Sequence, residues 1–104
     1  MKYVLVFYGG GMPETPAAQA RVMKQWTTWY TKLGASVVDA GLPFSGAVNK
    51  IKPEGVSKGP IGTRATGYTI LEAGTLDKAT TMAKGCPILK SGGSVAVYET
   101  ASMM

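Results

Sequence analysis

Residues 2–8 have the sequence Lys-Tyr-Val-Leu-Val-Phe-Tyr and are followed at once by Gly9-Gly10-Gly11. A run of aromatic and β-branched residues that glycines end is typical of a β-strand. Alternate positions of a strand form two faces, and here both are apolar: Val4, Val6 and Tyr8 on one, Tyr3, Leu5 and Phe7 on the other. We therefore expect this strand to lie in a sheet that is covered on both sides.

A helix is predicted after this strand, from Ala17 to Leu33. The preceding Thr15-Pro16 is typical of an N-cap followed by the first helical position. Within the range, apolar residues recur at helical spacing: Val22, Trp26, Trp29 and Leu33. Gly34 follows, and glycine is the residue that most often supplies the left-handed conformation at the end of a helix.

The rest of the chain predicts three more strands, a hairpin and a second helix. The strands are expected at 35–40, 66–73 and 94–99, with a loose hairpin around Pro53-Glu54-Gly55. Thr75 is the expected N-cap of a helix over 76–84, whose inward residues would be Leu76, Ala79, Thr80 and Ala83. This order predicts one α+β domain over residues 1–104, ferredoxin-like βαββαβ with an extra hairpin insertion. Because both helices then cover one face, a second copy is expected on the other, which predicts a homodimer.

The chain of 104 residues contains no histidine and a single cysteine, Cys86. These counts exclude Ser-His-Asp and Cys-His catalysis, histidine-ligated metals, an intrachain disulfide and a CxxC pair. We predict no cofactor and no metal site. Cys86 follows a predicted helix C-terminus, where the dipole disfavours a thiolate, so a packed small residue is favoured over a reactive thiol.

The charges point to no particular partner. Eleven Lys and Arg residues against six Asp and Glu give a net charge of +5, and Lys50, Lys52, Lys58 and Arg64 cluster together. We interpret this cluster as a solvated loop, with a phosphate-binding patch as the alternative. The glycines at 9–11 favour a turn over a phosphate loop, because they lack the GxGxxG and GxxxxGK[ST] spacings.

Two further classes of partner are not expected. Residues 67–70 lack the basic residue and the second aromatic of an RNA-recognition strand, so no nucleic acid is predicted. The chain has no apolar run with the length of an export signal or a membrane span. We therefore expect a cytoplasmic protein with no membrane partner.

Five stretches carry a resemblance to a known family. They are Met-Lys-Tyr-Val-Leu-Val-Phe-Tyr-Gly at 1–9, Gly-Tyr-Thr-Ile-Leu-Glu-Ala at 67–73, Leu-Asp-Lys-Ala at 76–79, Ala-Lys-Gly-Cys-Pro at 83–87 and Gly-Gly-Ser-Val-Ala-Val-Tyr-Glu at 92–99. In order and spacing they resemble the YCII-related (DGPF-type) domain family over essentially the whole chain. The resemblance implies a ferredoxin-like subunit that assembles into a dimeric α/β barrel. It also implies, for some members, a His–Asp pair in a cleft between the sheet and the helices.

That pair is incomplete here. Ile88 follows the Gly-Cys-Pro stretch, where many relatives have histidine, and Asp39 is the acid near the expected place. Asp39 is the candidate catalytic residue, and the alternative is a structural role in which it accepts N–H bonds from the turn at Gly41. A carboxylate acts as a base near neutral pH only where burial raises its pKa. Whether the chain is an enzyme is therefore left open.

Aromatic residues are the candidates for a binding site, because strand-end tyrosines can offer a hydroxyl to a ligand in a cleft. The residues that we expect to line it are Tyr8, Trp26, Pro43, Phe44 and Tyr68. For the tryptophan, helical spacing favours a place in the core. We predict a domain that binds a small molecule in a cleft between sheet and helices of a homodimer. The alternative is a dimerising interaction module without catalytic activity.

Overall fold

The strand β1 (Lys2–Tyr8) lies inside a four-stranded sheet with the order β2-β5-β1-β6. The structure is a computed structural model, and it describes residues 1–11 and 13–101. The partners of β1 are β5 (Ala65–Glu72) and β6 (Ser94–Glu99), both antiparallel to it, and β2 (Val37–Asp39) pairs antiparallel with β5. With α1 (Pro16–Leu33) and α2 (Leu76–Ala83) as the crossovers, the fold is α+β and ferredoxin-like.

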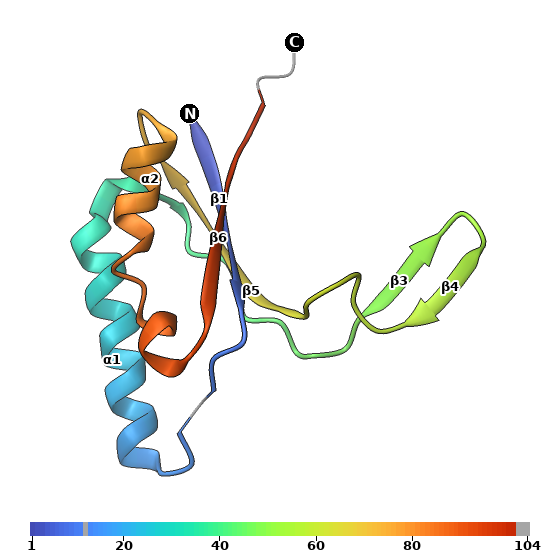
Figure 1. The fold of residues 1–104 in the computed structure, drawn as a ribbon. Helices are drawn as coiled ribbons and strands as arrows, with labels where there is room; N and C mark the ends of the chain where they lie inside the picture. The colour runs from blue at the N-terminus through green and yellow to red at the C-terminus, as the bar shows by residue number, and fades with distance from the viewer. Residues whose placement is uncertain (12, 102–104) are drawn as a thin grey trace.

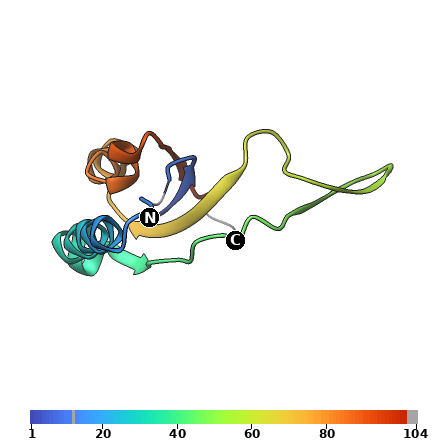
Figure 2. The same cartoon turned by 90° about the horizontal axis from the view of Figure 1, so that it is seen from below.

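Both predicted helices form, with the predicted caps. The Thr15 hydroxyl accepts the Ala18 N–H at 3.2 Å, and the Thr75 hydroxyl accepts the Lys78 N–H at 3.1 Å. Both helices lie on the same side of the sheet (Figures 1 and 2). One detail of α2 is corrected, because Leu76 in its first turn is exposed and the buried side begins at Ala79.

The core lies between this side of the sheet and the helices. Its buried members come from strands, helices and the segment after α2: Leu5, Phe7, Trp29, Leu71, Ala83, Cys86 and Ile88. Trp29 of α1 lies against Phe7 of β1 with the ring centroids 6.5 Å apart. The inward face of β1 is therefore the one that carries Phe7.

The second strand is shorter than the sequence predicts. Residues Gly34–Ser36 form a 3-10 turn, so β2 includes only Val37–Asp39. The pairing with β5 shifts register between Val37 and Asp39. Beyond the strand, Pro43 forms an isolated bridge with Gly67, and this contact keeps the chain beside β5 before it turns away.

The predicted hairpin is confirmed as a separate two-stranded sheet. Strands β3 (Asn49–Lys52) and β4 (Gly55–Lys58) pair with each other, and their base is closed by a 2.9 Å bond from the Gly59 N–H to the Val48 carbonyl. The hairpin extends away from the side of the sheet opposite the helices (Figures 1 and 2). We call residues 49–58 the arm.

The outer face of the sheet is apolar and is left uncovered by the helices. It carries Val4 and Val6 from β1, which are half-buried, and Val38 and Tyr98 from the edge strands, which are exposed. None of the helices in the part of the chain that the structure describes is long and apolar enough to cross a membrane.

Candidate functional site

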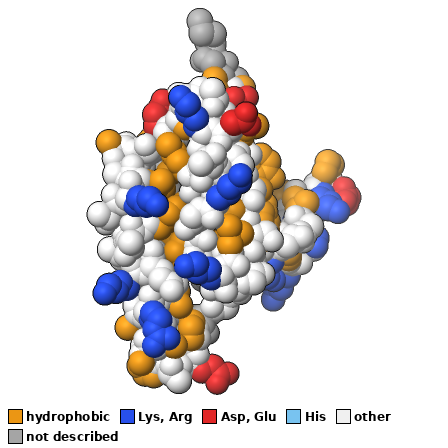
Figure 3. Space-filling view, turned by 60° about the vertical axis from the view of Figure 1, so that its left-hand side comes forward, with side chains coloured by type: hydrophobic (Ala, Val, Ile, Leu, Met, Phe, Trp, Pro, Cys, Tyr) orange, Lys and Arg blue, Asp and Glu red, His pale blue; other side chains and the backbone are white. Residues whose placement is uncertain are grey.

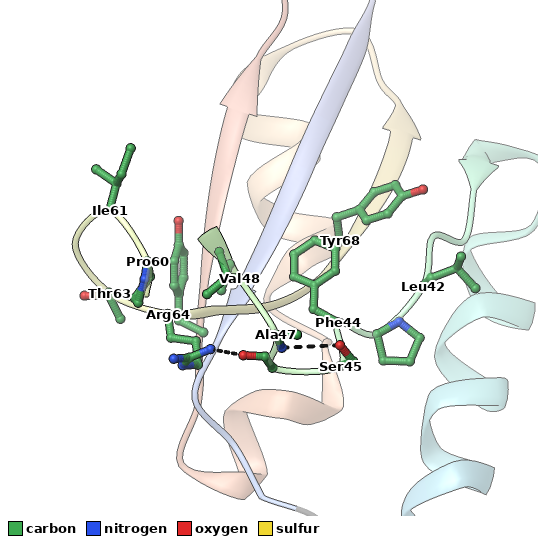
Figure 4. A pocket seen from close by; sticks show the side chains of 14 residues that line it. Leu42, Phe44, Ser45, Ala47, Val48, Pro60, Ile61, Thr63, Arg64 and Tyr68 are labelled. Atoms are coloured by element: carbon green, nitrogen blue, oxygen red, sulfur yellow. Dashed lines mark hydrogen bonds between the residues drawn. The ribbon is translucent and has the colours of Figure 1, made fainter. Parts of the chain in front are cut away.

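A cavity of about 630 Å³ lies where the arm joins the sheet. Its lining combines Tyr8 from the end of β1 and Tyr68 from β5 with two stretches of the connecting chain. Figure 4 shows Tyr68 and residues of both stretches. These stretches supply Leu42, Pro43, Phe44, Ser45, Gly46, Ala47 and Val48, and Pro60, Ile61, Thr63, Arg64 and Ala65. The cavity therefore combines the open end of the sheet with the base of the arm.

Thr66 holds this end of the sheet together. Its hydroxyl donates to the carbonyls of Phe7 at 3.2 Å and Gly9 at 3.3 Å, and its own carbonyl accepts the Phe44 N–H at 2.9 Å. The register between β1 and β5 shifts between Phe7 and Tyr8. The extra residue is Thr66 of β5, because Phe7 pairs with Gly67 and Tyr8 pairs with Ala65, and a bulge of this kind re-aims the side chain of the residue that it inserts.

Two aromatic rings form one wall of the cavity. Phe44 and Tyr68 stack with their centroids 6.0 Å apart and their planes at 27° (Figure 4). Phe44 comes from the chain that leaves the sheet and Tyr68 from β5. Phe44 is 48% exposed, so its ring is accessible to a planar ligand that stacks on it.

Arg64 is the one charged residue among those that line the cavity. Its Nη1 donates to the Gly46 carbonyl, which ties the two connecting stretches together (Figure 4). Among residues 1–11 and 13–101, the only ion pair joins the Met1 amino group to Glu72. Because no carboxylate in these residues pairs with Arg64, its other N–H groups can bind an anion.

Burial raises the pKa of Tyr8, and its hydrogen bond and charge interaction with the neighbouring Tyr98 raise it further. The Tyr8 hydroxyl therefore stays neutral around pH 7 and can donate a hydrogen bond to a ligand. With Arg64 and the hydroxyl side chains of Ser45 and Thr63, the cavity then offers one cationic donor and several neutral ones on a mostly apolar surface.

Asp39 lies beside the cavity without lining it. Its Oδ1 accepts the Gly41 N–H at 2.8 Å, which is the hydrogen bond of the structural alternative. Its Oδ2 accepts a long bond of 3.5 Å from the Tyr68 hydroxyl, so Tyr68 connects it to the cavity. In the single chain this carboxylate is exposed, without the burial that a base requires.

Gly41 fixes the turn that holds Asp39. Its φ is +74°, and a Cβ at this position would lie 1.8 Å from the Tyr68 carbonyl oxygen. The position therefore accepts only glycine without moving β5. Next to it, the Ala40 carbonyl accepts bonds from the hydroxyls of Tyr30 at 3.2 Å and Thr69 at 2.9 Å.

The structure brings together four of the five predicted ligand residues: Tyr8, Pro43, Phe44 and Tyr68. Trp26 lies apart from them on the helix side, with its ring 5.3 Å from that of Phe7. The cavity is also placed differently from the predicted cleft, at the base of the arm instead of between sheet and helices. That these residues bind a ligand stays a prediction.

Sequence reasoning did not single out Arg64 as a site residue. It placed Arg64 in a solvated basic run with three lysines, and those lysines do not line the cavity. A signal was present in the glycines and proline at 59, 60 and 62, which indicate a turn that brings the chain back to the sheet.

A second, shallower groove of about 400 Å³ lies between α1 and the segment after α2. Its basic residues are Arg21, Lys24, Lys32 and Lys90. Figure 3 shows Lys and Arg side chains spaced apart over this face of the molecule. Those on α1 extend over about three helical turns, so they do not converge on one point. This groove has the character of a solvated face.

Cys86 is buried, and burial raises the pKa of its thiol to about 11. We expect it to react with a thiol reagent at neutral pH only when the protein unfolds. Because the unfolded thiol ionises first, the free energy of unfolding is expected to fall between about pH 9 and pH 11. A Cys86→Ser variant, which does not ionise, should lose that part of the decline. Rapid labelling of the folded protein at pH 7 would contradict this placement.

No group of three or more Asp, Glu or Cys side chains that could hold a metal ion occurs in the ranges that the structure describes.

Comparison with known proteins shows the fold and not the family. No family model matches the chain, and no curated protein matches it. Among solved structures it is similar to 5-chloro-2-hydroxyhydroquinone dehydrochlorinase (TftG) from Burkholderia phenoliruptrix AC1100, in complex with 2,5-dihydroxybenzoquinone. The match has a TM-score of 0.58 and 16% sequence identity, and it covers 97% of this chain and 94% of that chain. At this identity the likeness establishes a shared fold.

Proposed function

We propose that this chain binds a small planar molecule with an acidic group in the cavity at the base of the arm, as a homodimer of the YCII-related, dimeric α/β barrel type. The observation that carries the proposal is that one cavity combines the stacked rings of Phe44 and Tyr68 with Arg64, which has no carboxylate partner within residues 1–11 and 13–101. Few polar groups on an apolar surface are typical of small-molecule sites.

The chemistry of the cavity selects the kind of ligand. A flat ring would lie against the aromatic wall, and a carboxylate or an ionised hydroxyl would accept N–H bonds from Arg64. The structural neighbour TftG is in complex with 2,5-dihydroxybenzoquinone, which is a flat ring with acidic hydroxyls. That compound is therefore a suitable first probe for this chain.

The dimer is proposed from the outer face of the sheet. Val4 and Val6 lie there beside exposed Val38 and Tyr98, which leaves an apolar surface that a monomer rarely keeps in water. A second copy, with the same face turned toward it, buries this surface in a symmetric interface. The arrangement corresponds to two sheets packed face to face.

Catalysis remains an open part of the proposal. The chain has no histidine, so its acid–base chemistry would depend on Asp39 and the Tyr68 hydroxyl, which lie 3.5 Å apart at the edge of the cavity. Binding does not require either group to transfer a proton. We therefore place ligand binding first and Asp39 second, as a candidate base whose burial would come from the second copy.

The test compares benzoate with benzamide, two rings of equal size that differ in charge, and adds 2,5-dihydroxybenzoquinone. We expect the wild-type protein to prefer benzoate, and Arg64→Met to weaken benzoate binding about tenfold while leaving benzamide unchanged. Arg64→Lys keeps the charge and should retain part of the preference. Thermal shift and ligand titration measure these effects.

The matched control is Arg21→Met, which removes the same charge from α1, away from the cavity. It should leave benzoate binding unchanged. Equal weakening by both variants would mean that net charge alone attracts the anion. If none of the three probes binds the wild-type protein, the proposed ligand class is wrong.

A second candidate is the interaction module without a small-molecule site. The observation in its favour is the exposure of Leu42 and Ile61, two large apolar residues that line the cavity. If this module is the function, the protein forms dimers, a metabolite library gives no thermal shift, and the cavity is occupied by side chains of a partner.

A further inference from the structure

The arm exposes two large apolar side chains in the single chain. Ile51 is 74% exposed and Val56 is 66% exposed, although both are large apolar residues. The two are directly paired across β3 and β4. Because alternate residues of a strand point to opposite faces, Lys50 and its partner Ser57 lie on the other side. One face of the arm therefore carries the apolar Ile51–Val56 pair near its tip and the polar Asn49–Lys58 pair at its base, and the other face carries Lys50 and Ser57.

Among residues 1–11 and 13–101, no other strand pairs with this hairpin. Strands β3 and β4 form a sheet of their own, separate from the four-stranded sheet. A two-stranded hairpin without a packing surface is at best marginally stable in water. The chain has a radius of gyration of 15.2 Å, against about 13 Å for a compact domain of this length. The arm thus requires a surface outside its own subunit.

The direction of the arm identifies that surface. It leaves the sheet on the side opposite the helices, which is the side of the uncovered apolar face (Figures 1 and 2). Four residues per strand give the arm a length of about 13 Å, whereas two stacked sheets lie about 10 Å apart. A second copy stacked on the outer face is therefore flanked by the arm.

We propose that the arm clasps the second copy of this chain with its Ile51–Val56 face, and that the docked copy closes the cavity at the base of the arm. The inference rests on the homodimer of the proposed function. Two-fold symmetry gives each subunit one arm around its partner, so both cavities are completed in the same way.

The second copy would close the cavity because part of the cavity wall lies on the outer face of the sheet. Tyr8 is on the same face of β1 as Val4 and Val6, and Tyr68 is paired with Val6 across the strands. Both tyrosines line the cavity. A sheet that covers Val6 therefore also covers the side of the cavity that these rings form, and the subunit alone leaves this side open to water.

The test places a lysine on each face of the arm. Val56→Lys puts a charge on the clasping face, and Ser57→Lys puts the same charge at the neighbouring position on the opposite face. We expect Val56→Lys to raise the dissociation constant of the dimer about a hundredfold, since each dimer loses two buried valines. Ser57→Lys should leave it nearly unchanged. Sedimentation equilibrium over a dilution series measures both.

Ile51→Lys is the second variant on the clasping face, and it should act like Val56→Lys. Ligand affinity is read in the same samples, and benzoate binding should weaken as the dimer dissociates. If the wild-type protein is a dimer and Val56→Lys and Ile51→Lys change its dissociation constant no more than Ser57→Lys does, the arm does not hold the second copy. The proposed dimer itself would still stand. Unchanged benzoate affinity in dissociated variants overturns the closure, and a monomeric wild-type protein overturns the dimer itself.

Discussion

Replacing Trp29 by alanine is expected to lower the free energy of unfolding by about 3–5 kcal/mol. Trp29 is 5% exposed and lies among the rings of Phe7, Trp26 and Tyr30. Its indole N–H also donates to the Met82 carbonyl at 3.1 Å, which joins α1 to α2. Truncation leaves a cavity under both helices and removes the indole bond to the Met82 carbonyl, which then keeps only backbone donors such as the Gly85 N–H. Against a total of about 5–15 kcal/mol, such a loss is severe.

Urea denaturation measures this loss, with Trp26 as the remaining fluorescent reporter. Because a dimer unfolds in a concentration-dependent way, the variants are compared at one protein concentration. Trp29→Phe is the matched control: it keeps an aromatic ring and removes the N–H donor, so it should cost clearly less than Trp29→Ala. A Trp29→Ala variant within about 1 kcal/mol of the wild type would contradict the packing described for the core.

Replacing Tyr98 by lysine is expected to dissociate the dimer. Tyr98 lies on the outer face of the sheet, opposite Val4 of β1, and is 55% exposed in the single chain. In the proposed interface it becomes buried, and loss of a buried interface tyrosine costs about 2 kcal/mol or more per copy. Two copies per dimer raise the dissociation constant about a thousandfold.

The control for this variant is Met23→Lys on α1. Met23 is 57% exposed, so the substitution replaces an equally accessible apolar residue on the opposite side of the molecule. Neither change is expected to disturb folding of the subunit, which circular dichroism verifies. Sedimentation velocity should show a monomer for Tyr98→Lys and a dimer for Met23→Lys. If both variants form dimers of equal stability, the interface does not lie on the outer face of the sheet.

Most of the fold could be predicted from local patterns in the sequence. The Thr15 and Thr75 caps, the helical spacing of Trp29 and the glycine-ended strand at 2–8 depend on neighbouring residues only, and each is confirmed. Residues 35 and 36 were predicted as strand, but the turn after α1 includes them in a 3-10 conformation. The exposed Leu76 shows that a first-turn position can satisfy helical periodicity without reaching the core.

The site was predicted only in part, because long-range contacts create it. Tyr8 and Tyr68 were identified as strand-end tyrosines, and β1–β5 pairing brings them to one cavity. Arg64 enters through its bond to the Gly46 carbonyl, between two irregular stretches that have no periodicity to follow. Trp26 was included for its aromatic ring alone, and its helical position places it against Phe7 on the other side.

Amide proton–nitrogen correlation spectra are the most direct test of whether this chain binds a planar anion at the base of the arm. The spectra are recorded during a titration with 2,5-dihydroxybenzoquinone. We expect the signals that move to belong to Tyr8, to Phe44 through Val48, and to Thr63 through Tyr68. Signals that move instead around Trp26, or a spectrum that does not change at saturating ligand, would contradict this expectation.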